Sequence, residues 1–247
     1  MPLFFLDSSN ISDSEVRIRG DIVKHLRGSL RYIEGDRIYV IDERRIRYKV
    51  EISKIERNEI KGTIINREVC EKGEEKEIVL GQGIIKGKRM DFVIQKAVEL
   101  GISKIVPLIT ERTIVRPSEE KRPFQLKRWK TIAQEASQQS ERWNIPVIEP
   151  HTDILSFFNR YQRDDYLYII LWEEESEQRL KDIVRQSVNK KGIICLVGSE
   201  GGFSYKEIVL AKEKGYISIS LGDRILRTET ASLAIISILQ YELGDMG

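Results

Sequence analysis

Cysteine and histidine are scarce in this sequence, with two residues of each among 247. Cys70 and Cys195 are too few for a disulfide framework or a zinc site, so no metal is expected. No stretch approaches the roughly 20 consecutive apolar residues that span a bilayer. The first residues lack a basic start and reach Asp7 after a short apolar run, which is not the pattern of a signal peptide. These absences predict a cytoplasmic protein without a membrane partner.

Charge is nearly balanced over the whole chain but unevenly placed. The net charge is +2, whereas residues 17–67 hold fourteen Lys and Arg against eight Asp and Glu. A second basic stretch, residues 112–130, includes Phe124 and Trp129. Basic surfaces with aromatic residues suit nucleic acid, because phosphates provide affinity and bases stack on rings. Charge alone leaves open the alternative of a solvated charged surface.

Two glycine-bearing loops late in the chain are the most informative feature. Residues 193–197 are continuously apolar, as in a strand buried on both faces, and lead directly into the run G-S-E-G-G at 198–202. Ser204 and Glu207 then form a capping box that starts a helix to residue 214. A second strand over 216–221 leads into the run L-G-D-R-I-L-R-T-E-T-A and a helix over 228–243. In an open α/β sheet, ligands bind beyond the carboxyl ends of such strands.

The second loop favours a ligand site over a plain turn. Leu221, Ile225 and Leu226 provide apolar walls, and Gly222 leaves room beside them. An apolar slot with exposed backbone donors and acceptors suits an adenine base.

Two familiar phosphate-binding motifs do not fit. The lysine of a P-loop is missing after Gly198. Gly81, Gly83 and Gly87 resemble a dinucleotide fingerprint only superficially, because the next strand does not end in the expected acidic residue.

Strand and helix patterns divide the chain into two parts. The first seventy residues are rich in strand patterns with one short helix, which predicts a small β-barrel-like module, and residues 70–76 have the composition of a linker. From residue 77 on, strands alternate with helices, which predicts a parallel α/β sheet. The expected strands are 38–41, 46–52, 60–65, 78–80, 105–108 and 167–171, and the expected helices are 22–30, 89–100, 124–142 and 180–186.

The two loops resemble those of the RsmE family, the 16S ribosomal RNA uridine-N3 methyltransferases of the SPOUT class. The family pattern is G-P-E-G-G followed by L-G-x-R-x-L-R-x-E-T-A, and this sequence departs from it at Ser199, where proline is usual. The serine predicts a slightly looser loop, because proline stiffens the backbone. Weaker matches extend through K-R-M-D-F at 88–92 and back to His25 and Arg31.

The resemblance implies an N-terminal PUA-like domain over residues 1–72 that binds RNA. It also implies a SPOUT methyltransferase domain over residues 73–247 with a deep trefoil knot. It also implies S-adenosylmethionine as cofactor, a homodimer, and 16S ribosomal RNA or the small ribosomal subunit as partner. The implied RNA contacts are Arg17, His25, Arg31, Arg112 and Arg142. The implied cofactor contacts are Leu171, Trp172, Leu196, Val197, Gly198, Glu200, Gly201, Gly202, Leu221, Gly222, Ile225 and Leu226.

Three charged residues of the second loop are candidates for the chemistry. Uridine N3 is a poor nucleophile until it loses its proton, and the negative charge then spreads to the carbonyl oxygens. Arg227, with Arg224 beside it, is expected to stabilise this charge, and Glu229 to accept the proton. Glu229 could instead cap the N-terminus of the following helix. A second alternative is that Arg224, Arg227 and Glu229 form an ion-pair cluster on the surface.

The last helix is apolar nearly all round, which predicts burial in a core or at a subunit interface. Two other functions stay open: a SPOUT enzyme with another target RNA or position, and an RNA-binding protein without catalysis. The intact pair of loops disfavours the second, because a binder needs no adenine slot.

Overall fold

The computed structural model describes residues 1–70, 76–178, 180–184, 189–244 and 246. The chain divides into two compact units, one of residues 1–73 with 137–145, the other of residues 74–136 with 146–247. The boundary expected at residue 72, and most of the linker expected over 70–76, lie outside the described residues.

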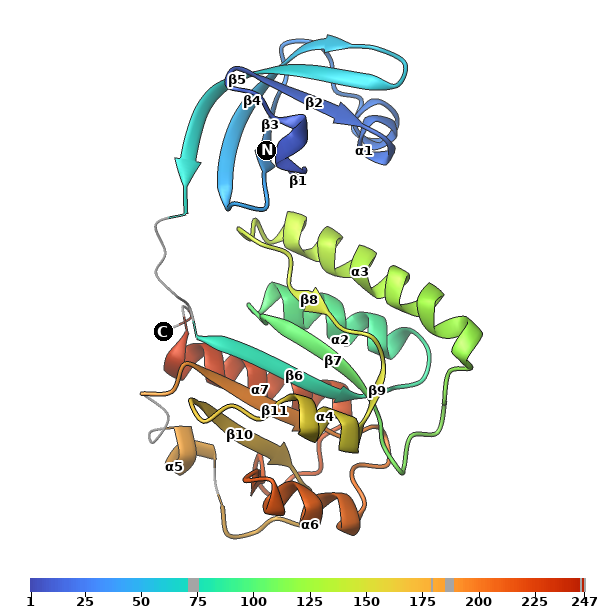
Figure 1. Ribbon diagram of the computed structural model, residues 1–247, viewed down its shortest axis with the longest axis vertical. Helices are drawn as coiled ribbons and strands as arrows, with labels where there is room; N and C mark the ends of the chain where they lie inside the picture. The colour runs from blue at the N-terminus through green and yellow to red at the C-terminus, as the bar shows by residue number, and fades with distance from the viewer. Residues whose placement is uncertain (71–75, 179, 185–188, 245, 247) are drawn as a thin grey trace. The chain divides into compact units, whose positions relative to one another are not determined.

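The first unit is built on a five-stranded mixed sheet with the strand order β1-β3-β4-β5-β2 (Figure 1). The β1–β3 pair is parallel and the other neighbours are antiparallel. The sheet curls into a half-barrel around a core of alternate strand residues such as Val16, Ile38 and Val50. The strands are β1 (Leu3–Phe5), β2 (Glu15–Arg19), β3 (Arg37–Ile41), β4 (Ile46–Ile55) and β5 (Glu59–Val69).

Short helices complete this unit. A 3-10 turn, η1 (Ser8–Asn10), follows β1, and α1 (Asp21–Lys24) continues into a π-helical turn, η2 (His25–Ser29), where the sequence predicts a helix. Val23 and Leu26 of these turns are buried in the core of the sheet.

The second unit holds a parallel sheet with the order β12-β10-β11-β6-β7-β8, and β9 also pairs with β7. The predicted parallel α/β sheet is therefore confirmed. Its strands are β6 (Glu77–Gly83), β7 (Lys104–Ile109), β8 (Val147–Ile148), β9 (Thr152–Asp153), β10 (Tyr166–Leu171), β11 (Gly192–Val197) and β12 (Ile217–Ile219).

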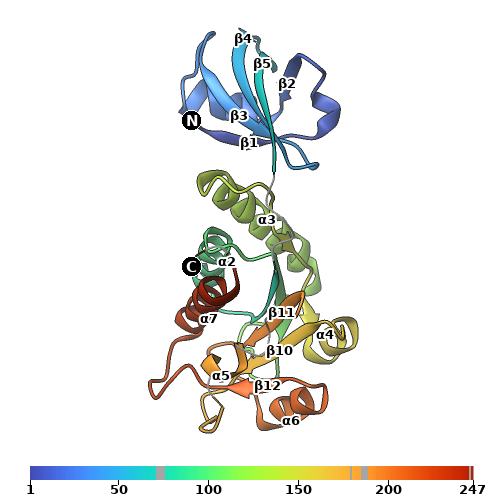
Figure 2. The ribbon, with the colours of Figure 1, turned by 90° about the vertical axis from the view of Figure 1, so that its left-hand side faces the viewer.

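Helices cover both faces of this sheet. Figure 2 shows α2 and α7 on one face and α4 and α6 on the other. Every residue of β11 is buried, as expected for a central strand covered on both sides. The helices along the chain are α2 (Lys88–Glu99), η3 (Glu119–Lys121), α3 (Arg122–Gln139), α4 (Ile154–Arg160), α5 (Leu180–Val184), α6 (Tyr205–Glu213) and α7 (Thr228–Leu243).

Burial decides the chemistry of the β11 thiol. Cys195 is fully buried, and this burial raises its pKa to about 12. The thiol is therefore held neutral and unreactive, as its place in an apolar strand predicts. Within the part of the chain that the structure describes, the helices are all too short or too polar to cross a bilayer.

Several predicted elements differ from the observed ones. The helix expected over 124–142 begins and ends earlier, as α3 (Arg122–Gln139), and the strand expected over 216–221 shrinks to β12. Residues 185 and 186 of the helix expected over 180–186 lie outside the described residues. The last helix is not buried all round: Ile235, Ile236 and Leu239 are fully buried, whereas Ile238 and Tyr241 are exposed.

Gly81 and Gly83 lie inside β6 and not in a loop after it, so a dinucleotide-binding turn does not form there. A Cβ atom on Gly83 would lie 2.3 Å from the backbone nitrogen of Ser199 and 2.6 Å from the carbonyl carbon of Gly198. Glycine is therefore needed for the end of β6 to approach the loop that follows β11.

Replacing Gly83 with alanine tests this close approach. Because the clash is with backbone, we expect Gly83→Ala to lower the free energy of unfolding by at least about 2 kcal/mol, measured by urea denaturation. Gly28→Ala is the control, since a Cβ there meets nothing within 4 Å. Equal unfolding midpoints for the two variants would contradict the close approach.

Candidate active site

The loops after β11 and β12 meet in one pocket with the end of β10. The strand order places β10 between β11 and β12, so the carboxyl ends of all three strands lie together. The pocket has a volume of about 800 Å³ and is lined by residues of these strand ends, of both loops and of the start of α7. Its size falls within the range of about 300–1,000 Å³ typical of small-molecule sites.

Most of the sequence-predicted cofactor residues line this pocket. Lining residues from the prediction are Leu171, Trp172, Val197, Gly198, Glu200, Gly202, Leu221, Gly222, Ile225 and Leu226. Leu196 and Gly201 do not line it. The Leu196 side chain packs in the core with Phe157 and Phe203, and the Gly201 carbonyl accepts a hydrogen bond from Arg112 on another side of the loop.

The arginine and glutamate candidates of the second loop also reach the pocket. Arg224, Arg227 and Glu229 all line it. The Oε2 atom of Glu229 is buried and makes no hydrogen bond within the described part of the chain. A buried carboxylate oxygen without a donor is costly to keep, which suits an atom that meets a ligand group.

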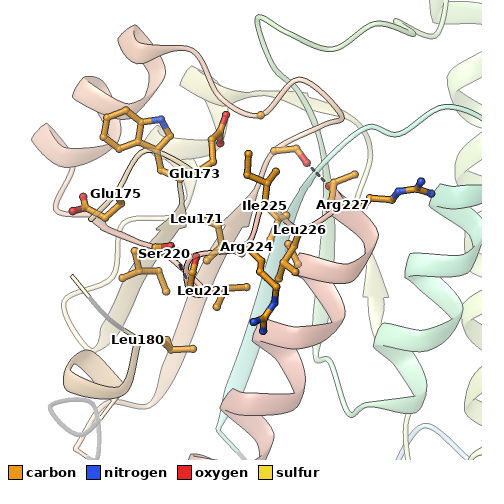
Figure 3. A pocket seen from close by; sticks show the side chains of 18 of the residues that line it. Leu171, Glu173, Glu175, Leu180, Ser220, Leu221, Arg224, Ile225, Leu226 and Arg227 are labelled. Atoms are coloured by element: carbon orange, nitrogen blue, oxygen red, sulfur yellow. Dashed lines mark hydrogen bonds between the residues drawn. The ribbon is translucent and has the colours of Figure 1, made fainter. Parts of the chain in front are cut away.

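The opposite side of the pocket carries carboxylates that the sequence reasoning missed. Figure 3 shows Glu173 and Glu175 on one side and Arg224 and Arg227 on the other. Burial raises the pKa of Glu175, but hydrogen bonds from Ser218 and from the Glu177 N–H, with the nearby Lys212 ammonium, outweigh it and leave the pKa below its ordinary value. Glu175 is therefore a fixed negative charge at neutral pH. The acidic run at 173–175, directly after β10, is the sequence feature that indicates carboxylates at this strand end.

The first loop is held from the side of α2. The Glu200 carboxylate accepts a hydrogen bond from the Lys86 N–H at 3.0 Å and pairs with the Arg89 guanidinium. Arg89 also lines the pocket. Glu200 thus fixes the loop to the start of α2.

A buried amide ties the two loops together. Gln82 of β6 is fully buried, and its Nε2 atom lies 2.9 Å from the Gly83 carbonyl oxygen, 3.1 Å from Thr228 Oγ1 and 3.3 Å from the Gly198 carbonyl oxygen. Its Oε1 atom accepts from the Ser232 hydroxyl, and Thr228 Oγ1 donates to the Gly198 carbonyl. One side chain therefore joins the end of β6, the first loop and the first turns of α7.

The predicted RNA contacts lie in both units. Arg17, His25 and Arg31 are exposed in the first unit, which also includes Arg142. Arg112 is exposed in the second unit, directly after β7.

Replacing Gln82 with leucine tests the buried network. The change keeps the side-chain size but leaves the Gly83 carbonyl without its amide donor, so we expect a loss of about 1–3 kcal/mol in the free energy of unfolding, measured by urea denaturation. Gln139→Leu, at an exposed position, is the matched control and should stay within about 0.5 kcal/mol of the parent. A Gln82→Leu protein as stable as the parent would show that the amide does not hold the loops.

Comparison with known proteins gives a consistent family. Residues 72–240 match the family described as RNA methyltransferase domain. Ribosomal RNA small subunit methyltransferase E of Bacillus subtilis is 30% identical over 91% of this chain and 89% of its own. The enzyme of the same name from Aquifex aeolicus is 35% identical over 90% and 92%.

A solved structure agrees over the full length. The crystal structure of a ribosomal RNA small subunit methyltransferase E from Neisseria gonorrhoeae, bound to S-adenosyl methionine, superimposes with a TM-score of 0.90 at 32% identity and covers 100% of both chains. With the two loops, their shared pocket and these relatives together, the chain belongs to the ribosomal RNA small subunit methyltransferase E family of RNA methyltransferases.

Proposed function

We propose that this protein transfers a methyl group from S-adenosylmethionine to N3 of a uridine in 16S ribosomal RNA. The observation that carries the proposal is the single pocket built from the two glycine-bearing loops, in a chain of this family. The Neisseria gonorrhoeae relative is bound to S-adenosyl methionine, and the curated relatives are named for the small-subunit ribosomal RNA. We propose the cytoplasm as the compartment, because ribosomal subunits are assembled there.

The residues present in the pocket fit this cofactor. When bound, S-adenosylmethionine supplies an electrophilic methyl group on a positively charged sulfonium. Leu221, Ile225 and Leu226 offer apolar contact to the adenine, and the backbone of the loops offers donors and acceptors. The carboxylates of Glu173 and Glu175 favour the positive charges of the cofactor on their side of the pocket.

The basic side of the pocket suits the uridine. Glu229, whose Oε2 atom is buried without a donor, is proposed to take the N3 proton. Arg227, with Arg224, is proposed to stabilise the negative charge that spreads over N3 and the flanking carbonyl oxygens. Arg227 is the N-cap residue of α7, so its side chain leaves the chain directly before the helix, at the pocket.

The first unit is proposed to bind the RNA, as a PUA-like module. The surplus of Lys and Arg over residues 17–67 supports this, and Arg17, His25 and Arg31 are exposed there. The family resemblance also supports a deep trefoil knot in the second unit.

Removing the Arg227 guanidinium tests the chemistry. We expect Arg227→Ala to keep S-adenosylmethionine binding, measured by calorimetry, while methyl transfer falls by about 100-fold or more, because only the developing charge on uracil loses support. The assay maps N3-methylated uridines in 16S ribosomal RNA from cells that lack the protein, before and after incubation with it.

Lys88→Ala, an exposed change at the start of α2, is the control and should transfer methyl normally. Folded protein that binds neither the cofactor nor its demethylated product would refute the methyltransferase proposal. A fully active Arg227→Ala would remove only this arginine from the mechanism.

We also propose a homodimer that uses the exposed apolar side of α7. Ile238 and Tyr241 are three residues apart, so they share one face of the helix, and Ile238 also lines the pocket. A partner subunit on this face would cover both side chains and stand beside the site.

Placing a charge on this face tests the dimer. In Tyr241→Glu the carboxylate would be desolvated without a counter-charge, so we expect light scattering to show mainly monomer, with methyl transfer reduced in parallel. Glu242→Gln, next to it on the helix, should leave assembly unchanged. A parent protein that is a fully active monomer would refute the dimer.

A further inference from the structure

A short turn after β7, outside the pocket lining, is hydrogen-bonded to the first loop. We name this turn, residues 110–113, the strap. Thr110 and Thr113 are buried, and the Thr113 hydroxyl accepts a hydrogen bond from the Thr110 N–H at 2.9 Å. The strap residues are not part of the pocket lining.

The strap is anchored to the helix that follows the loop. Glu207 is buried and serves two partners: its Oε2 atom accepts from the Ser204 N–H at 2.8 Å, and its Oε1 atom accepts from the Glu111 N–H at 2.8 Å. The capping box that begins α6 therefore also fixes the strap in place.

Two hydrogen bonds join the strap to the loop itself. The Ser199 hydroxyl donates to the Arg112 carbonyl oxygen at 3.1 Å, and Ser199 is 3% exposed. In return, Nη1 of Arg112 donates to the Gly201 carbonyl oxygen at 3.0 Å. Between these two points the Gly202 N–H donates to the Ser199 carbonyl oxygen at 3.0 Å, which closes the loop.

We propose that the strap holds loop 198–202 in the shape that binds the cofactor, with Ser199 and Arg112 as positioning residues. Gly198, Ser199, Glu200 and Gly202 of the loop line the pocket, while the strap, which does not line it, bonds to the loop through the Ser199 hydroxyl and the Gly201 carbonyl. A glycine-rich loop has many conformations in the free state, and each bond that fixes it lowers the entropy lost on binding. The proposal rests on the proposed function, because it takes the loop to be the cofactor loop.

The strap gives two sequence features a different meaning. Ser199 stands where the family pattern has proline, and its hydroxyl supplies a restraint that a proline ring cannot make. Arg112, an RNA contact implied by the family resemblance, also donates from its guanidinium to the loop carbonyl, and the RNA contact stays a prediction. If Arg112 contacts RNA, its removal lowers RNA affinity and the salt dependence of RNA binding. If it belongs to the strap, its removal lowers cofactor affinity even in the absence of RNA.

Calorimetry with S-adenosylmethionine and the full chain, without RNA, tests the strap. We expect Ser199→Ala and Arg112→Ala each to weaken cofactor binding by about three- to tenfold, the fold-change of one lost hydrogen bond. The KM for the cofactor should rise while kcat changes little. Ser103→Ala is the matched control for Ser199, because the Ser103 hydroxyl accepts from the Ile78 N–H at the opposite end of β7. Arg160→Ala, which removes an exposed guanidinium paired with Glu149 outside the pocket, is the matched control for Arg112.

Hydrogen exchange of the Gly202 amide in the cofactor-free protein gives a second readout. Exchange should be faster in Ser199→Ala than in the parent, and unchanged in Ser103→Ala. The proposal is overturned if both strap variants bind the cofactor within about twofold of the parent. It is also overturned if Gly202 exchange is unchanged in Ser199→Ala. If the parent protein itself binds no cofactor, the proposed function fails, and the exchange measurement still decides whether the strap restrains the loop.

Discussion

The second unit depends on one buried side chain, the amide of Gln82. It connects residues 116, 146 and 150 positions away along the chain, namely Gly198, Thr228 and Ser232. A buried amide must satisfy both its donors and its acceptor, so these segments are held in one arrangement and not merely near one another. Gly83, next to it, lets the first loop approach closely enough for these bonds to form.

The first loop of the pocket is held by hydrogen bonds and an ion pair from several other segments of the second unit. Glu200 is fixed by the start of α2, Ser199 by the strap after β7, and Gly198 by Gln82 and Thr228. Two of these restraints come from the end of β6 and the segment after it, one from the segment after β7, and one from the start of α7. Glu173 and Glu175 after β10 and Arg224 and Arg227 before α7 lie on different sides of the pocket, because the two segments enter it from different strands.

The sequence allowed much of this unit to be predicted, where the signals are local. The apolar run of β11, the capping box at Ser204 and Glu207, and both ends of α7 are confirmed. Contacts between distant segments could not be predicted, because nothing near Gln82 or Ser199 in the chain indicates its partner. The helix α4 was missed, since its few turns lie between weak strand patterns. Glu175 was missed because the acidic run after β10 does not show which of its carboxylates reaches the pocket, and the partners Ser218 and Lys212 lie far along the chain.

The strand order also has a consequence for synthesis. The strand made first in this unit, β6, ends beside β11 and β7, and apart from Gly83 the partners of its Gln82 side chain lie in segments made much later. Such long sequence separations slow folding, and a nascent chain would expose unpaired strand edges meanwhile. Until α7 has been translated, Gln82 lacks Thr228 and Ser232 as hydrogen-bond partners, and the pocket lacks the wall that α7 provides. A partly made chain therefore cannot sequester cofactor, and the ribosome must complete α7 before it has made a competent site.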